Sequence, residues 1–146
     1  MKRYFESPIF LILLFAITFA VAKTTPEPPA VGTVQEFTAD YNNKNIDKLV
    51  SLYAEDALMV SETGVAQGRD AIRARLSTGI NRGNTIDALH PEKSDTSGDL
   101  SYTEGTADVL SGGQKLQRHY LVIVKTVGSH REITIHYSLP SQGKTP

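Results

Sequence analysis

The sequence predicts one α+β domain, with helices gathered on one face of an antiparallel sheet. Helical periodicity is confined to the first part of the chain beyond residue 30, and strand-like runs fill the second half. Short turn-forming segments such as Ser111-Gly112-Gly113 join these runs and favour antiparallel hairpins. Helices followed by such a series of hairpins are typical of an α+β fold. Of the 146 residues, 124 follow the N-terminal segment described next, which is enough for a single core.

The first 22 residues have the features of a secretory signal peptide. Lys2 and Arg3 give a basic start, and residues 9–22 are almost entirely apolar. This run of about 14 residues is shorter than the ~20 that cross a bilayer as a helix. It ends in Ala-Val-Ala, the small-residue pattern that a signal peptidase recognises. We therefore expect cleavage after Ala22 and a secreted or periplasmic protein with no membrane segment; an uncleaved anchor is the alternative.

Composition excludes several classes of function. The predicted signal carries Lys2, Arg3 and Glu6, so its removal takes one net positive charge from a chain of formal charge −1 and leaves −2. This balance offers no general attraction for nucleic acid or an anionic membrane. Because the chain has no cysteine, it has no disulfide, thiolate nucleophile or zinc–thiolate site. We expect a partner that is recognised locally, and no cofactor.

Three helices are expected in the first half of the mature chain. Residues 23–30 contain three prolines and predict an extended linker. Helical spacing then places Val34, Phe37 and Tyr41 on one face of a helix that ends near Asn42. A second helix, capped by Asn45, has the apolar face Ile46, Leu49, Val50 and Tyr53. A short strand over residues 57–61, ended by Gly64, precedes a third helix that begins near residue 68 and directs Ile72, Leu76 and Ile80 inward.

Strand-like runs make up the second half of the chain. They cover residues 85–93, 100–110, 115–126 and 131–139. The segments between them contain Gly, Ser and Asp and predict hairpin turns. With residues 140–146 interpreted as a flexible tail, the folded domain is expected over residues 31–139.

Two segments resemble the nuclear transport factor 2-like superfamily, in its SnoaL-like and ketosteroid-isomerase-like branches. Residues 49–57 have the pattern Leu-x-x-Leu-Tyr-Ala-x-Asp-Ala, and residues 68–73 have Gly-Arg-x-x-Ile-Arg. The resemblance covers nearly all of the mature chain and implies a cone-shaped roll. In such a roll, three helices pack on a strongly curved antiparallel sheet around a pocket open at one end. Function does not follow, since this fold serves both enzymes and binding modules.

Alternation along the strands selects the residues expected to face the pocket. In the last strand the odd positions are apolar and the even ones polar, which favours an inward face of Ile133, Ile135, Tyr137 and Leu139. Alternation alone leaves the strand at 100–110 undecided. The family alignment implies that its inward face holds Tyr102, Glu104 and Asp108. It also implies that the next strand directs inward Leu116, Arg118, Tyr120 and Val122.

The residues expected to contact a ligand are Phe37, Tyr41, Tyr53, Ser61, Tyr102, Glu104, Asp108, Arg118, Tyr120, Ile135 and Tyr137. Glu104 is the candidate catalytic base, because a carboxylate enclosed in an apolar pocket can be tuned for proton transfer. Arg118 is the only cation expected inside and would pair with it. The alternative is a structural ion pair at the pocket mouth or on the solvated face.

The isomerase branch can be compared position by position. It is known to use a Tyr on the first helix, an acidic base on the first strand and a second acid on the strand that opens the last hairpin. The matching residues here are Phe37, Ser61 and Arg118, and none can fill these roles. A steroid-type isomerase is therefore disfavoured, although Glu62 would supply a base if the register slipped by one residue.

Histidine positions favour neither a metal site nor a catalytic dyad. His119 and His136 have outward parity, His90 precedes a proline, and His130 lies in a turn. Without H-x-H or H-x-x-x-H spacing, no metal site is expected.

One strand is apolar on both faces between Tyr120 and Val124. Helices can cover only one face of the sheet, so we expect Leu121 and Ile123 to lie in a homodimer interface on the outer face. A bend or edge that covers them is the alternative. The function that the sequence favours is an exported protein that binds a small organic molecule in a hydrophobic cone. The alternatives are an enzyme of the isomerase, dehydratase or cyclase type that uses Glu104, and a non-catalytic dimeric interaction module.

Overall fold

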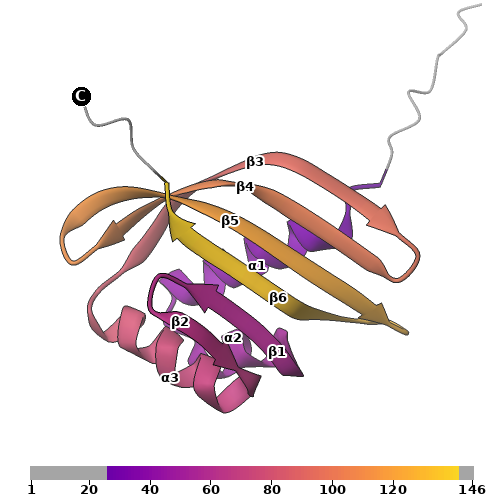
Figure 1. Ribbon diagram of the computed structural model, residues 1–146, viewed down its shortest axis with the longest axis horizontal. Helices are drawn as coiled ribbons and strands as arrows, with labels where there is room; N and C mark the ends of the chain where they lie inside the picture. Colours follow the sequence, from indigo (N-terminus) through magenta and orange to yellow (C-terminus); the bar gives the residue numbers. More distant parts are fainter. Residues whose placement is uncertain (1–25, 142–146) are drawn as a thin grey trace, which may run out of the picture.

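The computed structural model describes residues 26–141 as three helices and six strands (Figure 1). The helices are α1 (Pro29–Asn42), α2 (Ile46–Ser51) and α3 (Gly68–Asn81). The strands are β1 (Tyr53–Ser61), β2 (Gly64–Gln67), β3 (Thr85–Ser97), β4 (Leu100–Ser111), β5 (Gln114–Val127) and β6 (His130–Pro140). The predicted signal peptide and its cleavage site lie outside the described residues. Among these residues, no helix is long and apolar enough to span a bilayer.

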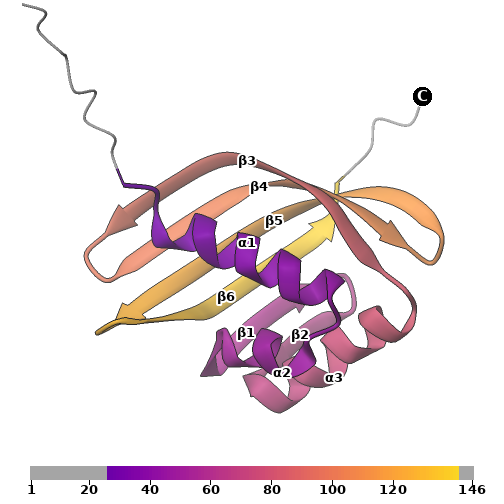
Figure 2. The ribbon, with the colours of Figure 1, turned by 180° about the vertical axis from the view of Figure 1, so that it is seen from behind.

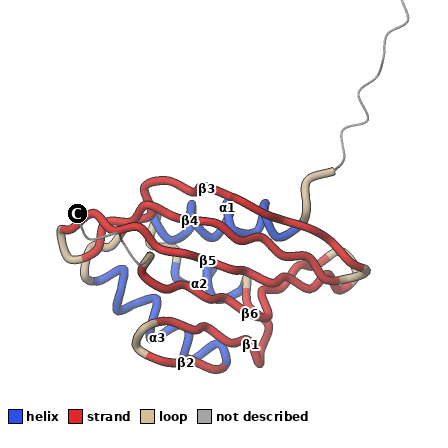
Figure 3. Tube along the Cα trace, turned by 45° about the horizontal axis from the view of Figure 1, so that its top comes forward, coloured by secondary structure: helices blue, strands red, loops and turns tan. Residues whose placement is uncertain are grey.

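All six strands form one sheet, in the order β2-β1-β6-β5-β4-β3. Neighbouring strands are antiparallel except for β1 and β6, which are parallel. The sheet is therefore mixed and not wholly antiparallel, because no tight turn dictates the relative direction of β1 and β6. The long strands bend together over the helices (Figure 3). This arrangement confirms the α+β roll that the sequence predicts.

The helices all lie on one face of the sheet (Figure 2). Helix α1 crosses β3, β4 and β5, whereas α3 packs on β1 and β2. The core between these layers contains fully buried Leu49, Tyr53, Ile72, Val124 and Ile133. Burial of each such side chain contributes about 1.5–3 kcal/mol to folding. The opposite, outer face of the sheet is covered by none of the described helices.

Several element boundaries differ from the expectation. Helix α1 begins at Pro29, inside the segment expected to be a linker, since a proline at the first helical position lacks only an N–H that has no helical partner. Tyr53 opens β1 and is not part of the second helix, which ends at Ser51. Gly64 begins a further strand, β2, and its φ of +101° suits the tight turn that precedes it.

A β-bulge in β6 changes which side chains face the helices. Val124 of β5 pairs with Ile133, but Ile123 pairs with Ile135, so Thr134 is an extra residue in β6. Beyond the bulge the alternation is reversed. Ile133 and His136 are therefore both buried, and Ile135 lies on the outer face.

Candidate functional site

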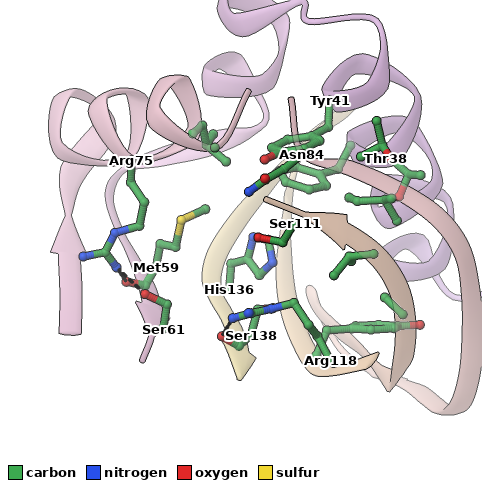
Figure 4. Close-up of a pocket in the computed structure, with 18 of the residues that line it drawn as sticks. Thr38, Tyr41, Met59, Ser61, Arg75, Asn84, Ser111, Arg118, His136 and Ser138 are labelled. Atoms are coloured by element: carbon green, nitrogen blue, oxygen red, sulfur yellow. Dashed lines mark hydrogen bonds between the residues drawn. The ribbon is translucent and has the colours of Figure 1, made fainter. Parts of the chain in front are cut away.

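A cavity of about 440 Å³ lies between the helices and the sheet (Figure 4). Its lining comes from α1, α3 and five strands and is largely aliphatic and aromatic. Representative apolar lining residues are Val34, Phe37, Met59, Leu76, Ile86, Val109, Val122 and Ile133. Polar and charged side chains also line the cavity, among them Arg75, Asn84, Arg118 and His136. An apolar cavity with polar groups that can orient a ligand is the general character of small-molecule sites.

The structure divides the expected ligand contacts into two groups. Those that line the cavity are Phe37, Tyr41, Ser61, Arg118 and Tyr120. Tyr53 is fully buried beside the cavity. The remaining residues are absent from the lining: Tyr102, Glu104, Asp108, Ile135 and Tyr137.

The expected inward face of β4 is wrong, because residues directly paired across two strands share a face of the sheet. Arg118 and Tyr120 of β5 point inward, and their partners in β4 are Ala107 and Gly105. The odd positions of β4 therefore face the helices. Glu104 is paired with outward-facing Leu121 and is exposed, so it cannot act as a base on a molecule in this cavity.

Asp108 and Tyr102 follow Glu104 onto the outer face. There the Asp108 carboxylate lies 2.8 Å from Nε2 of His90, and this hydrogen bond is the main cause of its lowered pKa. Ile135 and Tyr137 lie on the same outer face because of the bulge in β6. Leu139 pairs with His119 and also lies away from the cavity.

Arg118 forms its ion pair with Glu62, not with Glu104. Its Nη1 and Nη2 donate to Glu62 Oε1 at 3.0 Å and Oε2 at 2.6 Å, and its Nε donates to Ser138 Oγ at 3.0 Å. This bidentate contact lowers the pKa of Glu62. Glu62 lies in the β1–β2 turn, so the pair joins this turn to β5 at the rim of the cavity. Arg118 thus forms an ion pair at the pocket mouth, as in the alternative interpretation of the sequence, but its partner is Glu62 and not Glu104.

His136, expected on the outer face, is a buried residue of the cavity lining (Figure 4). It is 9% exposed, and its Nδ1 lies 2.6 Å from the hydroxyl of Tyr53. The Phe37 ring packs edge-on against the imidazole at a centroid distance of 5.0 Å. Burial, with a smaller contribution from the Arg118 charge, lowers the pKa of His136 to about 4. The imidazole is therefore neutral at pH 7.

The contact with Tyr53 determines which nitrogen of His136 carries the proton. Burial raises the pKa of Tyr53 well above its ordinary value, so the phenol keeps its proton. Within residues 26–141, Nδ1 of His136 is the only hydrogen-bond partner of this hydroxyl, so Tyr53 donates and Nδ1 accepts. A neutral imidazole has one N–H. His136 therefore carries it on Nε2, which has no partner among the described residues.

Two further polar groups border the cavity. Arg75 of α3 donates from Nη1 to the Ser61 hydroxyl at 3.1 Å and to the Gly64 carbonyl at 2.8 Å, which fixes the β1–β2 hairpin. Burial raises the pKa of Tyr41, and a hydrogen bond with Asn84 partly opposes that shift. Within the described part of the chain, no group of three or more His, Asp or Glu side chains could hold a metal ion.

Sequence reasoning missed His136 because a bulge is not visible in a pattern of alternation. The sequence did offer one indication. Between Ile133 and Tyr137, the even-numbered His136 is bulky enough to fill a core, as the odd-numbered residues are. Glu62 was noted only as a base in a shifted register. Its role depends on the β1–β2 turn, which was not expected.

A helical layer over a curved sheet, with a cavity between them, defines the nuclear transport factor 2-like class of proteins. Within that class, residues 34–133 match the model of the SnoaL-like domain, and the chain belongs to this family. No protein with a curated description matches the sequence.

Solved structures share the architecture at low identity. A ketosteroid isomerase-like protein from Erwinia carotovora atroseptica has a TM-score of 0.67 at 10% identity, covering 77% of this chain and 94% of that chain. A putative calcium/calmodulin-dependent protein kinase type II association domain from Thiobacillus denitrificans has a TM-score of 0.68 at 11% identity, covering 81% and 100%. An NTF2-like protein with a cystatin-like fold from Novosphingobium aromaticivorans has a TM-score of 0.65 at 14% identity, covering 78% of this chain and 80% of that chain. At these identities the likeness establishes the fold alone.

Proposed function

We propose that this chain is an exported protein that binds a small organic molecule in the cavity between its helices and its sheet. The observation that carries the proposal is the cavity itself, about 440 Å³ in volume, whose lining combines aliphatic and aromatic side chains with polar and charged ones. Sites of this volume and character take molecules the size of metabolites or drugs. Export is supported by the basic start and the apolar run of residues 9–22.

A blocking substitution tests the binding function. Ala107 is buried, faces the cavity and lies on the same strand as exposed Glu104. We expect the native mass spectrum of the mature protein, purified from its own host, to show a retained small molecule. Ala107→Trp should lose that molecule, and Glu104→Trp should keep it. Val109→Phe adds less volume to the cavity lining and replaces Ala107→Trp in the test if that variant fails to fold. Retention by a folded blocked variant would contradict the proposal.

An enzyme that works by proton transfer is the second candidate, and it now depends on Glu62. Among the described lining residues, Glu62 is the only carboxylate. Its pKa is lowered by Arg118, which holds both carboxylate oxygens. A carboxylate so stabilised in its charged form is a weak base. Binding is therefore better supported than catalysis.

We also propose that two copies associate through the outer sheet face. Leu121 and Ile123 are partly exposed there and are paired with Tyr137 and Ile135 of β6, while Tyr102 of β4 lies opposite Ile123. None of these five side chains is charged, and the exposed carboxylate of Glu104, paired with Leu121, borders the patch. The helices that bury the other face do not reach this one (Figure 2).

A further inference from the structure

We propose that the molecule bound in the cavity carries a carbonyl-type oxygen, as in a ketone, aldehyde, ester or carboxylate, and that this oxygen accepts a hydrogen bond from Nε2 of His136. Tyr53 is the positioning residue that makes Nε2 the donor. This inference rests on the proposed binding function and specifies the chemistry of the ligand.

The imidazole is held in one orientation by its neighbours. Its Nδ1 is tied to the Tyr53 hydroxyl at 2.6 Å, and the two rings are nearly parallel, with an interplanar angle of 15°. The Phe37 ring meets it edge-on at 87°. A ring fixed in this way presents the other nitrogen to a constant place in the cavity. Pre-organised donors of this kind give a site its selectivity.

The positions of the Tyr53 and His136 protons make Nε2 of His136, the nitrogen on the cavity side, a hydrogen-bond donor and not an acceptor. Tyr53 is 0% exposed and has no second acceptor among the described residues for its hydroxyl proton. The lone pair of Nδ1 is therefore occupied, and the single proton of the neutral ring is on Nε2. A ligand group that only donates, such as an ammonium, would meet a donor there.

Charge in the lining favours the same class of ligand. Three arginines line the cavity, Arg75, Arg82 and Arg118, against the single carboxylate of Glu62. Glu62 is held by Arg118, so it is not free to attract a cation. The remaining positive charge favours a carbonyl dipole or a carboxylate and disfavours an amine.

Burial turns this preference into selectivity. A ligand that fills the cavity removes water from Nε2–H, and a buried donor without an acceptor is costly. A ligand with an oxygen at that place restores the bond, whereas an isostere without the oxygen leaves the donor unpaired. By analogy with sites built to hydrogen-bond one group, the isostere should bind more weakly by about 3- to 30-fold.

The protonated nitrogen can be observed without any ligand. Long-range proton–nitrogen spectra of the ¹⁵N-labelled mature protein at pH 7 distinguish the two neutral tautomers, and the His136→Gln variant assigns the resonance. We expect the proton of His136 on Nε2, and we expect Tyr53→Phe to remove this preference. A His136 that carries its proton on Nδ1, or is charged at pH 7, would overturn the inference.

Ligand selectivity is tested with two probes of the same shape, 2-acetylnaphthalene and 2-isopropenylnaphthalene, in which a CH₂ group replaces the carbonyl oxygen. The wild type should bind the ketone about 3- to 30-fold more tightly than the hydrocarbon. His136→Leu should bind both about equally, and His130→Leu, at the exposed start of β6, should keep the preference. Equal binding of both probes by the wild type would overturn the inference and leave small-molecule binding intact. Binding of neither probe would contradict both the inference and the proposed function.

Discussion

The hydroxyl of Tyr53 and Nδ1 of His136 are hydrogen-bonded at 2.6 Å, although the two residues are 83 positions apart in the sequence. Tyr53 opens β1, and His136 lies in β6 just beyond the bulge. The parallel pairing of these two strands brings the two side chains together on the face of the sheet that the helices cover. The chemistry of the cavity is therefore set by strand pairing between distant parts of the chain.

The burial of neutral His136 should make stability depend on pH. Its pKa is about 4 in the folded protein, against an ordinary value of 6.5. Between these values the unfolded chain binds a proton that the folded chain does not, so stability falls as the pH decreases through this range. From pH 7 to pH 5 the loss should be on the order of 2 kcal/mol.

Chemical denaturation of the wild type and His136→Gln at pH 7 and pH 5 measures this loss. Glutamine does not titrate, so the variant should lose less stability on acidification. The neighbouring residues Tyr53 and Tyr41 are the same in both proteins, and burial raises the pKa of each further above this range. Identical losses would mean that His136 is not buried in its neutral form.

The Arg118–Glu62 pair should show a coupling energy in a double-mutant cycle. Because Glu62 is 48% exposed, solvent screening limits the coupling to about 1 kcal/mol at pH 7. The pKa of Glu62 is lowered by folding, so the coupling is present above its ordinary value and is lost as the pH falls through the folded value. Denaturation of wild type, Arg118→Met, Glu62→Gln and the double variant gives the number.

Glu104→Gln is the matched control for that cycle, since Glu104 is an exposed carboxylate on the neighbouring strand but on the opposite face. Its cycle with Arg118→Met should give a coupling near zero. A larger coupling energy for Glu104 than for Glu62 would mean that Arg118 lies on the outer face of the sheet and not in the cavity.

Gly105 should not tolerate a side chain. A Cβ at this position would overlap the carbonyl oxygen of His90 and lie 2.9 Å from Cα of Pro91, both in the backbone of β3. Gly105→Ala should therefore destabilise the protein by about 1–3 kcal/mol. In Gly32→Ala the new methyl meets only the movable end of Arg131, and the helix gains about 0.5–1 kcal/mol. Thermal unfolding of the two variants should thus shift in opposite directions.

Dimerisation through the outer face should depend on Ile123. A glutamate there would place a charge in the proposed interface, and we expect Ile123→Glu to be monomeric at micromolar concentration in sedimentation velocity. Gln114→Glu, at the exposed start of the same strand, adds the same charge away from the patch and should remain dimeric. A monomeric wild type, or a dimeric Ile123→Glu, would exclude this interface.

Export should remove the first 22 residues. The charged start and the apolar run before Ala22 predict that the mature chain begins at Lys23. Intact mass spectrometry of the protein from the extracellular or periplasmic fraction measures this directly. Detection of the full-length chain in that fraction would argue for an uncleaved anchor.

The sequence by itself determined the three helices, five of the six strands and part of the cavity lining. Helical spacing of Val34, Phe37 and Tyr41 predicted the face of α1 that now borders the cavity, and glycine-containing turns predicted the β3–β6 hairpins. The inward face of β5 was implied by the family alignment; Arg118 and Tyr120 line the cavity, whereas Leu116 is exposed. The face of α1 and the hairpins depend on local periodicity and turn chemistry, which neighbouring residues encode.

Only the tertiary structure decided the chemistry inside the cavity. The inward face of β4 follows from its pairing with β5, and the burial of His136 follows from the extra residue Thr134. The same holds for the parallel contact of β1 with β6, which brings Tyr53 to His136, and for the turn that brings Glu62 to Arg118. Each depends on the register between strands. Register is selected by the packing of the whole sheet, because a shift of one residue moves every following side chain to the other face.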